Sequence, residues 1–438
     1  MCSNNIIPEI LGIKEKNLKI NDHKEEIING ITYSVIFGDL TCVPEKCPKC
    51  DSINENYSIV KNGTQKVKVL FNRANVYPLL LIMRKQRFLC KCCNSTFMAE
   101  TNLTDKGCFI SKNVKDSILI NLAEIKSMDL IAREHQVSAS TVARVLRTVE
   151  EKPGKKYLPK ILGIDEFKSV STVDASMSVN LVDNKNGGIY DILPDRRQSF
   201  LTNYFSSFPL KERRKVEFIT MDMYAPYVHL ARKLFPNAKI IIDKFHIVQL
   251  FTREFNKLRI QVMKDMNTKS RDYKILKNYW KLPLAKSWVL DCIHFGKRRY
   301  FYKSVCTVDI LEYLLSLSDT LKEAHEFYQE VLYAVDRADY EMLKSIIERN
   351  INTIPACFVK SIKSLRRFKQ PVLDALKYGY TNAVVEGKNN KIKALKRVAF
   401  GFRSFRNFRI RIMLMEKVKR QKGNIHDNPY GLSRYAAA

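Results

Sequence analysis

The sequence is poor in acidic residues and contains no long apolar run. It holds 45 Asp and Glu against 75 Lys and Arg, which gives a formal net charge of +30. No stretch of about 18 or more apolar residues occurs, so the sequence predicts no transmembrane helix. The first residues carry neither a basic segment nor a long apolar segment, so we expect no signal peptide.

The shortage of negative charge points to a polyanionic partner. A Lys-rich surface can simply be solvated, and genome composition can raise the Lys count, but neither explains an excess of this size. A field of this sign attracts double-stranded DNA, the densest common polyanion. We therefore expect a DNA partner, no membrane, and a cytoplasmic protein that is found at the bacterial nucleoid when it is bound to DNA.

Cysteine is scarce after residue 108, and eight of the eleven lie within residues 1–108. In a cytoplasmic protein, paired C-x-x-C spacing favours metal binding over disulfides. Short β-type runs separate two such pairs, which predicts a zinc ribbon over 41–105 that follows a weakly patterned lead-in at 1–40. The alternative is a set of unrelated buried cysteines, and Cys92 is spare in either case. The predicted ligands of one structural Zn²⁺ are Cys47, Cys50, Cys90 and Cys93.

Residues 110–150 have the pattern of a helix-turn-helix. A short packed helix is expected around Ile131, and Ser138 is a suitable N-cap for a second helix. A helix-turn-helix can also be a plain packing motif, but the basic surroundings favour contact with DNA. The positions expected to be exposed on the second helix are Ser140, Thr141, Arg144 and Arg147.

From residue 161 the pattern changes to strands that alternate with helices, after a charged linker at 150–160. Three strands that can pair antiparallel, followed by two strand–helix crossovers, are typical of an α/β ribonuclease H-like core with a mixed sheet of order 3-2-1-4-5. Residues 246–375 lack strand alternation and predict an all-helical insertion, in which Tyr279, Trp280 and Trp288 are more readily core residues than base-stacking platforms. The expected core therefore comprises 158–245 and 376–415, and a basic tail follows at 416–438.

Two buried strands end near an aspartate, Asp165 in LGIDEF and Asp222 in EFITMD. These strands are neighbours in the expected sheet, so the two carboxylates would lie side by side and repel each other unless a cation compensates. Glu386 opens a basic helical segment and completes a set of oxygen ligands for two Mg²⁺ or Mn²⁺ ions. Glu166 should point to the other face of its strand, outside this cluster. Asp243 ends the fifth strand and is expected to support the site.

The segment that begins at Glu386 is basic and rich in aromatic residues, with thirteen Lys or Arg between 386 and 422. A solvated basic helix with aromatic residues in the core is the simpler interpretation, but the same helix can also hold phosphates near the metals. The residues predicted to contact DNA here are Lys388, Asn389, Asn390, Lys393, Lys396, Arg397, Arg403 and Arg406.

The chain resembles the ISL-three family of bacterial insertion-sequence transposases along nearly its full length. The resemblance rests on the two cysteine pairs, the helix-turn-helix, IDEF at 164–167, DMYAPY at 222–227, DKFH at 243–246 and VEGKNNKIKALKRVAFGFRSFRNFR at 385–409. It implies a DDE transposase in which Asp165, Asp222 and Glu386 ligate the metals. It also implies a supporting role for Asp243 and His246, because related DDE transposases carry a C/D-x-x-H element at this place.

The function expected from the sequence is cleavage at the ends of an insertion sequence and joining of the freed 3′-hydroxyl to target DNA. Terminal inverted repeats would be bound by the zinc ribbon and the helix-turn-helix, and a homodimer or larger assembly would hold two ends. Two alternatives are a DNA-binding regulator that does not cut, and a nuclease of the same fold that cuts without joining.

Overall fold

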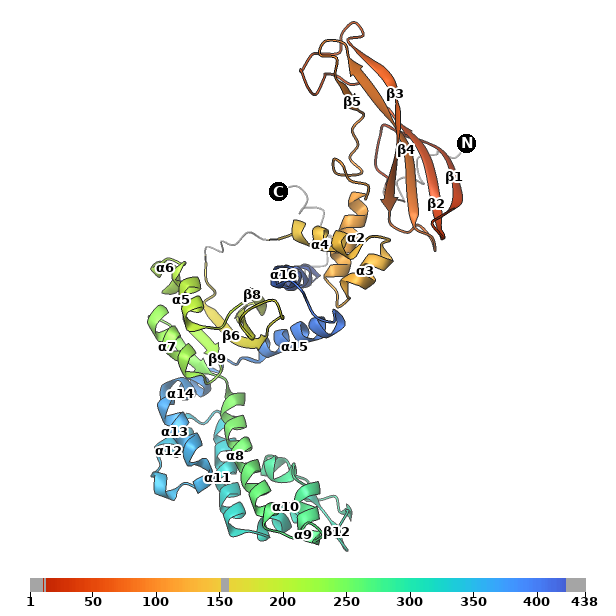
Figure 1. Cartoon of the computed structure of the whole chain (residues 1–438). Helices are drawn as coiled ribbons and strands as arrows, with labels where there is room; N and C mark the ends of the chain where they lie inside the picture. The colour runs from red at the N-terminus through yellow and green to blue at the C-terminus, as the bar shows by residue number, and fades with distance from the viewer. Residues whose placement is uncertain (1–10, 12, 151–156, 423–438) are drawn as a thin grey trace. The chain divides into compact units, whose positions relative to one another are not determined.

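The computed structural model describes residues 11, 13–150 and 157–422 (Figure 1). The linker expected at 150–160 falls mostly outside the described residues, and so do the first part of the expected lead-in and residues 423–438 of the expected tail. None of the helices that the structure describes combines the length and the apolar character needed to cross a membrane.

The chain divides into two compact units. Residues 1–152 and 392–438 form the first, and residues 153–391 form the second. We expected 392–415 to belong to the catalytic core, but these residues group with the N-terminal unit.

The first unit contains a five-stranded sheet of order β1-β2-β4-β3, with β5 paired to β4. We predicted a weakly patterned lead-in over 1–40, and this prediction is wrong for residues 18–40, because β1 and β2 lie there. Asn29 and Gly30, both with positive φ, make the tight turn that joins these two strands. The strands are β1 Leu18–Ile28, β2 Ile31–Leu40, β3 Ile59–Phe71, β4 Leu79–Cys90 and β5 Thr96–Met98.

Three short helices follow the sheet, and a serine caps each of them: Ser111, Ser127 and Ser138. Ser138 was the predicted cap of the second helix of the helix-turn-helix. The helices are α2 Lys112–Leu122, α3 Met128–Glu134 and α4 Ala139–Thr148.

The C-terminal helix α16, Phe405–Lys422, shares the apolar core of these three helices through Ile410 and Leu414. The buried Arg411 fastens it further, since its guanidinium donates to the carbonyl oxygens of Leu122, Glu124 and Lys126 at the end of α2. Residues 416–422, which we expected in a tail, are therefore part of a packed helix.

The second unit contains a mixed sheet of order β8-β7-β6-β9-β10. β6, β7 and β8 are antiparallel, while β9 and β10 run parallel to β6 and to each other. Leu162 and Ile164 of β6 belong to the core that includes α5 and α7. The elements are β6 Ile161–Lys168, β7 Met177–Asp183, β8 Gly188–Leu193, α5 Gln198–Ser206, α6 Leu210–Arg213, β9 Phe218–Met221, α7 Ala225–Leu234 and β10 Lys239–Ile242.

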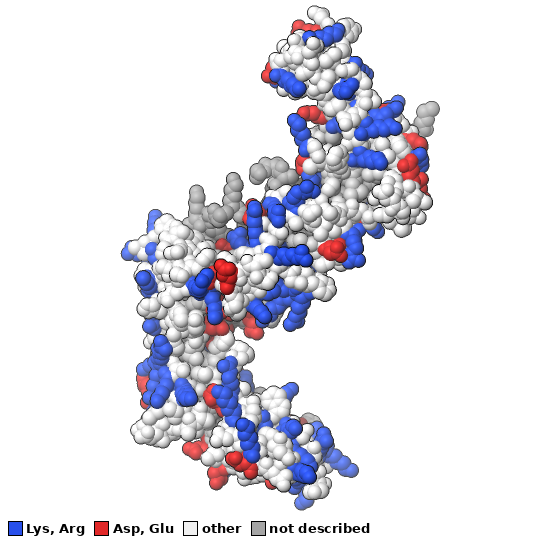
Figure 2. All heavy atoms as spheres, in the orientation of Figure 1, with Lys and Arg blue, Asp and Glu red and all other residues white. Residues whose placement is uncertain are grey.

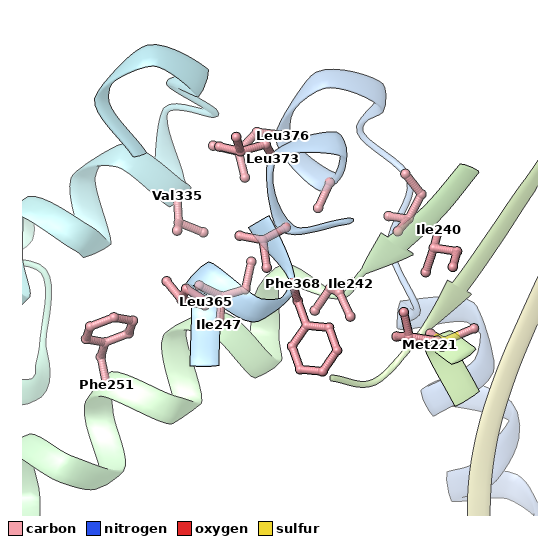
Figure 3. Close-up of a cluster of buried hydrophobic side chains, with 14 of the residues drawn as sticks. Met221, Ile240, Ile242, Ile247, Phe251, Val335, Leu365, Phe368, Leu373 and Leu376 are labelled. Carbon is pink, nitrogen blue, oxygen red and sulfur yellow. The ribbon is translucent and has the colours of Figure 1, made fainter. Parts of the chain in front are cut away.

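Helices dominate residues 244–378, and their core is continuous with that of the sheet. Figure 3 shows Ile242 of β10 beside Phe368 of the helical part, and Met221, Ile247 and Phe251 belong to the same buried cluster. The helices are α8 Lys244–Lys264, α9 Arg271–Asn278, α10 Thr307–Ser316, α11 Asp319–Asp336, α12 Tyr340–Glu348, α13 Val359–Arg367 and α14 Lys369–Tyr378, with short 3-10 turns at Leu282–Leu284, Ser287–Val289, Ile351–Thr353 and Ala356–Phe358.

Two expectations for the insertion were wrong. It is not helical throughout, since β11 Gly296–Lys297 and β12 Ser304–Val305 form a small hairpin. Trp280 and Trp288 are also more than one-third exposed, so they are not core residues.

Candidate active site

Asp165 and Asp222 stand side by side at the same edge of the second sheet. The parallel pairing of β6 with β9 ends at Gly163 and Thr220, and each aspartate lies two residues beyond that pair. Both side chains line a cavity of about 440 Å³. Burial, and after it the Asp222 charge, raises the pKa of Asp165 to about 6. A cation between the two carboxylates would relieve this repulsion.

His246 lies beside Asp222, in the first turn of α8. Its Nε2 is 2.6 Å from the Asp222 Oδ1, and this hydrogen bond raises the pKa of the imidazole. A histidine in this position fixes the orientation of the Asp222 carboxylate.

Asp243 does not line the cavity. One oxygen of its buried carboxylate caps α8 by accepting from the Phe245 N–H at 2.9 Å. The other accepts from the Asn382 N–H at 2.8 Å, one residue before helix α15, Ala383–Val398. The end of β10 is thereby tied to the start of the helix that carries Glu386.

Helix α15, Ala383–Val398, is attached to β6 by two contacts that flank Glu386. The Asn389 Nδ2 donates to the Asp165 Oδ2 at 2.7 Å, and the Asn389 Oδ1 accepts from the Asn180 Nδ2 at 3.0 Å. On the other side, Val385 packs so closely on Gly163 that an added Cβ there would be 2.6 Å from its Cγ2. Glu386 itself is exposed, on the turn between these contacts.

The carboxylates of Asp165, Asp222 and Glu386 lie farther apart than the ligands of a single metal ion would. Among the described residues, only the four predicted zinc cysteines place all their ligand atoms within 4.8 Å of one another. The structure therefore brings Asp165 and Asp222 together and leaves Glu386 on the neighbouring helix turn.

The cavity has a basic wall that the sequence did not predict. Arg196 and Arg253 line it, and the Arg196 Nη1 is 2.7 Å from the Glu166 Oε2. Burial raises the pKa of the Tyr227 hydroxyl on the same wall, and the nearby Glu166 raises it further. Glu166 also lines this cavity, but its carboxylate pairs with Arg196 rather than with the two aspartates.

The four predicted zinc ligands meet at one point in the first unit. The Cys47 and Cys93 sulfurs are 3.7 Å apart, and the Cys50 and Cys90 sulfurs are 3.8 Å apart. A tetrahedral site with Zn–S bonds of about 2.3 Å has S···S edges of about 3.8 Å, so the four thiolates fit zinc. Cys92 lies outside the group and accepts a hydrogen bond from Ser52.

A family model described as transposase, that of the ISL-three DDE transposases, matches residues 162–412, which is more than half of the chain. The chain belongs to this family.

Two curated relatives match parts of this transposase. A transposase for insertion sequence element IS1001 from Bordetella parapertussis is 24% identical over 284 residues, which is 64% of this chain and 66% of that protein. A protein named ATP-dependent protease from Lactococcus lactis subsp. lactis is 36% identical over 121 residues, which is 27% of this chain and 39% of that protein. The chain thus covers less than two-thirds of the length of either relative.

The predicted DNA-contact residues have different surroundings in the two helical segments. On α4, Ser140 and Arg144 are exposed, and Arg147 is exposed while its Nε donates to the Asn407 Oδ1 of α16. Thr141 was wrongly expected to be exposed, because it is buried and its hydroxyl accepts from Arg144. Arg406 makes a bidentate ion pair with Glu150.

Lys388 and Asn389 of α15 are buried, so neither presents the surface that we predicted for DNA contact. Asn389 faces Asp165 because α15 packs against β6, and helical periodicity alone cannot reveal this contact. Lys396 is half-buried, and the exposed members of the predicted set are Asn390, Lys393, Arg397, Arg403 and Arg406.

The sequence contained a signal for two cavity residues that we did not predict, Arg196 and Arg253. Arg196 follows β8, whose end lies at the same edge of the sheet as the end of β6, because β7 is antiparallel to both. Arg253 lies seven residues after His246 on α8, which is two helical turns on the same face.

Proposed function

We propose that this transposase binds the terminal inverted repeats of an insertion sequence, cleaves at the element ends and joins the 3′-hydroxyl to target DNA by two-metal-ion phosphoryl transfer. Asp165, Asp222 and Glu386 are the proposed metal ligands and catalytic residues. The observation that carries this proposal is the pair of adjacent aspartates, with the helix that bears Glu386 fastened to Asp165 through Asn389.

The donor set fits a hard divalent cation. Carboxylate oxygens are the ligands that Mg²⁺ and Mn²⁺ prefer. Burial, and after it the charge of Asp222, raises the pKa of Asp165, and a bound cation would offset both effects. When bound, such ions activate the attacking oxygen and stabilise the leaving 3′-oxygen. We expect the exposed side chain of Glu386 to turn toward β6 when the metals bind, because the contacts of Val385 and Asn389 hold its helix turn against that strand.

Residues around the aspartates complete the proposed machinery. Asn389 orients the Asp165 carboxylate, and His246 orients that of Asp222. Arg196 and Arg253 line the same cavity and are suited to bind non-bridging phosphate oxygens of the DNA strand. Since the protein supplies geometry and charge, no covalent serine or tyrosine intermediate is needed.

The fold supports the same proposal. Counted from β6, the strands lie in the order 3-2-1-4-5, with three antiparallel strands followed by two parallel ones. We infer a ribonuclease H-like core with a helical insertion between β10 and α15. The zinc site is then structural, since its four thiolates leave no position for substrate.

We assign recognition of the element ends to the first unit. Its zinc-binding sheet and helix-turn-helix carry exposed residues suited to DNA, such as Arg144, and two ends require a homodimer or larger assembly on DNA. The Lactococcus match covers too little of either protein to support a protease function.

The decisive experiment maps 3′ ends after incubation of the full chain with element-end DNA, with and without Mg²⁺ or Mn²⁺. We expect metal-dependent cuts at the repeat boundary that Asp222→Asn abolishes without loss of end binding. Asp174→Asn, an exposed carboxylate in the loop between β6 and β7, is the matched control and should cut normally.

Other outcomes separate the alternatives. Tight binding without cleavage under either metal favours a regulator, and cleavage without strand-transfer products favours a nuclease. For the zinc site, Cys47→Ser should lose bound zinc in elemental analysis, whereas Cys92→Ser should retain it.

A further inference from the structure

A small hairpin projects from the helical insertion, between α9 and α10. We call residues 291–305 the basic hairpin, in which β11 pairs antiparallel with β12. Its sequence, DCIHFGKRRYFYKSV, holds four Lys or Arg and one acidic residue. Figure 2 shows basic side chains at the end of the insertion where Figure 1 labels α9 and β12.

The tip of the hairpin is held firmly by the helical core beneath it. The Arg271 Nε donates to the Tyr300 carbonyl oxygen at 2.7 Å, and the Tyr279 hydroxyl donates to the Arg299 carbonyl oxygen at 3.0 Å. The Phe301 ring packs edge-on against Tyr279, with centroids 5.9 Å apart. These contacts make the tip a preorganised surface, and they leave its other side chains outside the core.

Two aromatic rings of the hairpin face solvent. Tyr302 is 93% exposed and Phe295 is 61% exposed, whereas the intervening Phe301 is packed. The Arg271 guanidinium lies 4.9 Å from the centroid of the Tyr302 ring, and no other ring or cation of the described residues is recorded against it. Most of this ring is therefore open to a stacking partner.

The four cations of the hairpin have no acidic partner. Lys297, Arg298, Arg299 and Lys303 take part in no ion pair that the structure records among its described residues. The hairpin's one acidic side chain, Asp291, instead accepts from the backbone N–H groups of Ile293 and His294. Four cations without acidic partners among the described residues, next to two exposed aromatic rings, suit a partner that carries both phosphate groups and planar aromatic groups.

We propose that the basic hairpin binds single-stranded DNA, with bases stacked on Tyr302 and Phe295 and phosphates held by the four cations. Aromatic side chains stack on unpaired bases, while a basic groove follows the backbone. An intact duplex hides its base faces, so it would use the cations alone. A protein partner would have to bury the four charges with the rings, which is costly without matching carboxylates.

The proposal goes beyond the proposed function, since binding of single strands by the insertion requires neither cutting nor recognition of element ends. The test uses the full chain and measures anisotropy with a labelled single-stranded 20-mer and with a duplex of the same sequence. Ultraviolet crosslinking to a bromouracil-containing strand, followed by mass spectrometry, locates the contact.

We expect crosslinks within residues 291–305. Tyr302→Leu should weaken binding of the single strand about 5- to 150-fold, which is the range for loss of one stacked base, and Tyr302→Phe should bind normally because it keeps the ring. Replacing the four cations with glutamine should lower the salt slope for the single strand by about 3, at about 0.7 per phosphate contact. Lys322→Gln, an exposed cation of α11, is the matched control and should change neither quantity.

Other results overturn the proposal. Equal losses of single-strand and duplex affinity in Tyr302→Leu would rule out stacking, and crosslinks confined to residues outside the hairpin would rule out the site. Because these measurements contain no cleavage step, a protein that fails to cut element ends can still pass them, so failure of the two proposals can be told apart.

Discussion

Replacing Asn389 with alanine is expected to damage both stability and cutting, because its amide links three parts of the site. The side chain is almost fully buried, donates to Asp165 and accepts from the buried Asn180. Loss of a hydrogen bond to a charged group costs about 1.5–3 kcal/mol, and a buried donor left without a partner costs about 1–3 kcal/mol. We therefore expect Asn389→Ala to lower the free energy of unfolding by about 3–5 kcal/mol.

The effect on activity follows from the position of Glu386, one helical turn before Asn389. Without the amide, the start of α15 is no longer fixed to Asp165, and a displacement of about 1 Å at a catalytic group can cost about 100-fold in rate. Asn390→Ala is the matched control, because its side chain is exposed on the same helix.

The assays are denaturant unfolding of the full chain and the rate of metal-dependent cutting, measured at a temperature where each variant is folded. Equal unfolding free energies and equal cutting rates for the Asn389 and Asn390 variants would refute the reasoning that α15 is held by this amide.

Three further predictions concern other contacts. Gly163→Ala should destabilise the fold by about 1–3 kcal/mol and slow cutting, because the added Cβ would press on Val385. Gly387→Ala, on the exposed side of α15, should be neutral or stabilising. Similar unfolding curves for both variants would contradict the close approach of Val385 to Gly163. Arg411→Met should cost about 3–5 kcal/mol in urea unfolding, since the carbonyl groups of Leu122, Glu124 and Lys126 lose the buried guanidinium that donates to them. A cost below about 1 kcal/mol would show that α16 is not held by this residue. Burial lowers the pKa of His325 to about 4, so the contribution of this residue to the free energy of unfolding is complete above about pH 6.5 and is lost as the pH falls toward 4. The free energy of unfolding should therefore decrease by about 3 kcal/mol between pH 7 and pH 4 on account of His325. Unfolding measured across this range should show that His325→Gln removes this part of the decrease.

The sequence by itself determined the elements that carry a strong local signal. Apolar runs that end in Asp165 and Asp222 predicted two strands, and both strands are present as neighbours, because strand pairing follows from chain order in a sheet of this kind. The spacing of Cys47 and Cys50, repeated at Cys90 and Cys93, predicted a group that the structure confirms, since a C-x-x-C turn positions both sulfurs locally.

Only the tertiary structure decided how distant segments meet. The periodicity of α15 marks an amphipathic helix, but it cannot say that Asn389 faces Asp165, which lies 224 positions away in the sequence. The same limit hid the docking of α16 on the helix-turn-helix, because Arg411 is a surface residue by composition and a buried one by its contacts with α2. It also hid Arg196, whose place in the cavity depends on which strand ends share an edge. Such contacts are fixed by packing and by the need to pair buried polar groups, and neither is readable from a single segment.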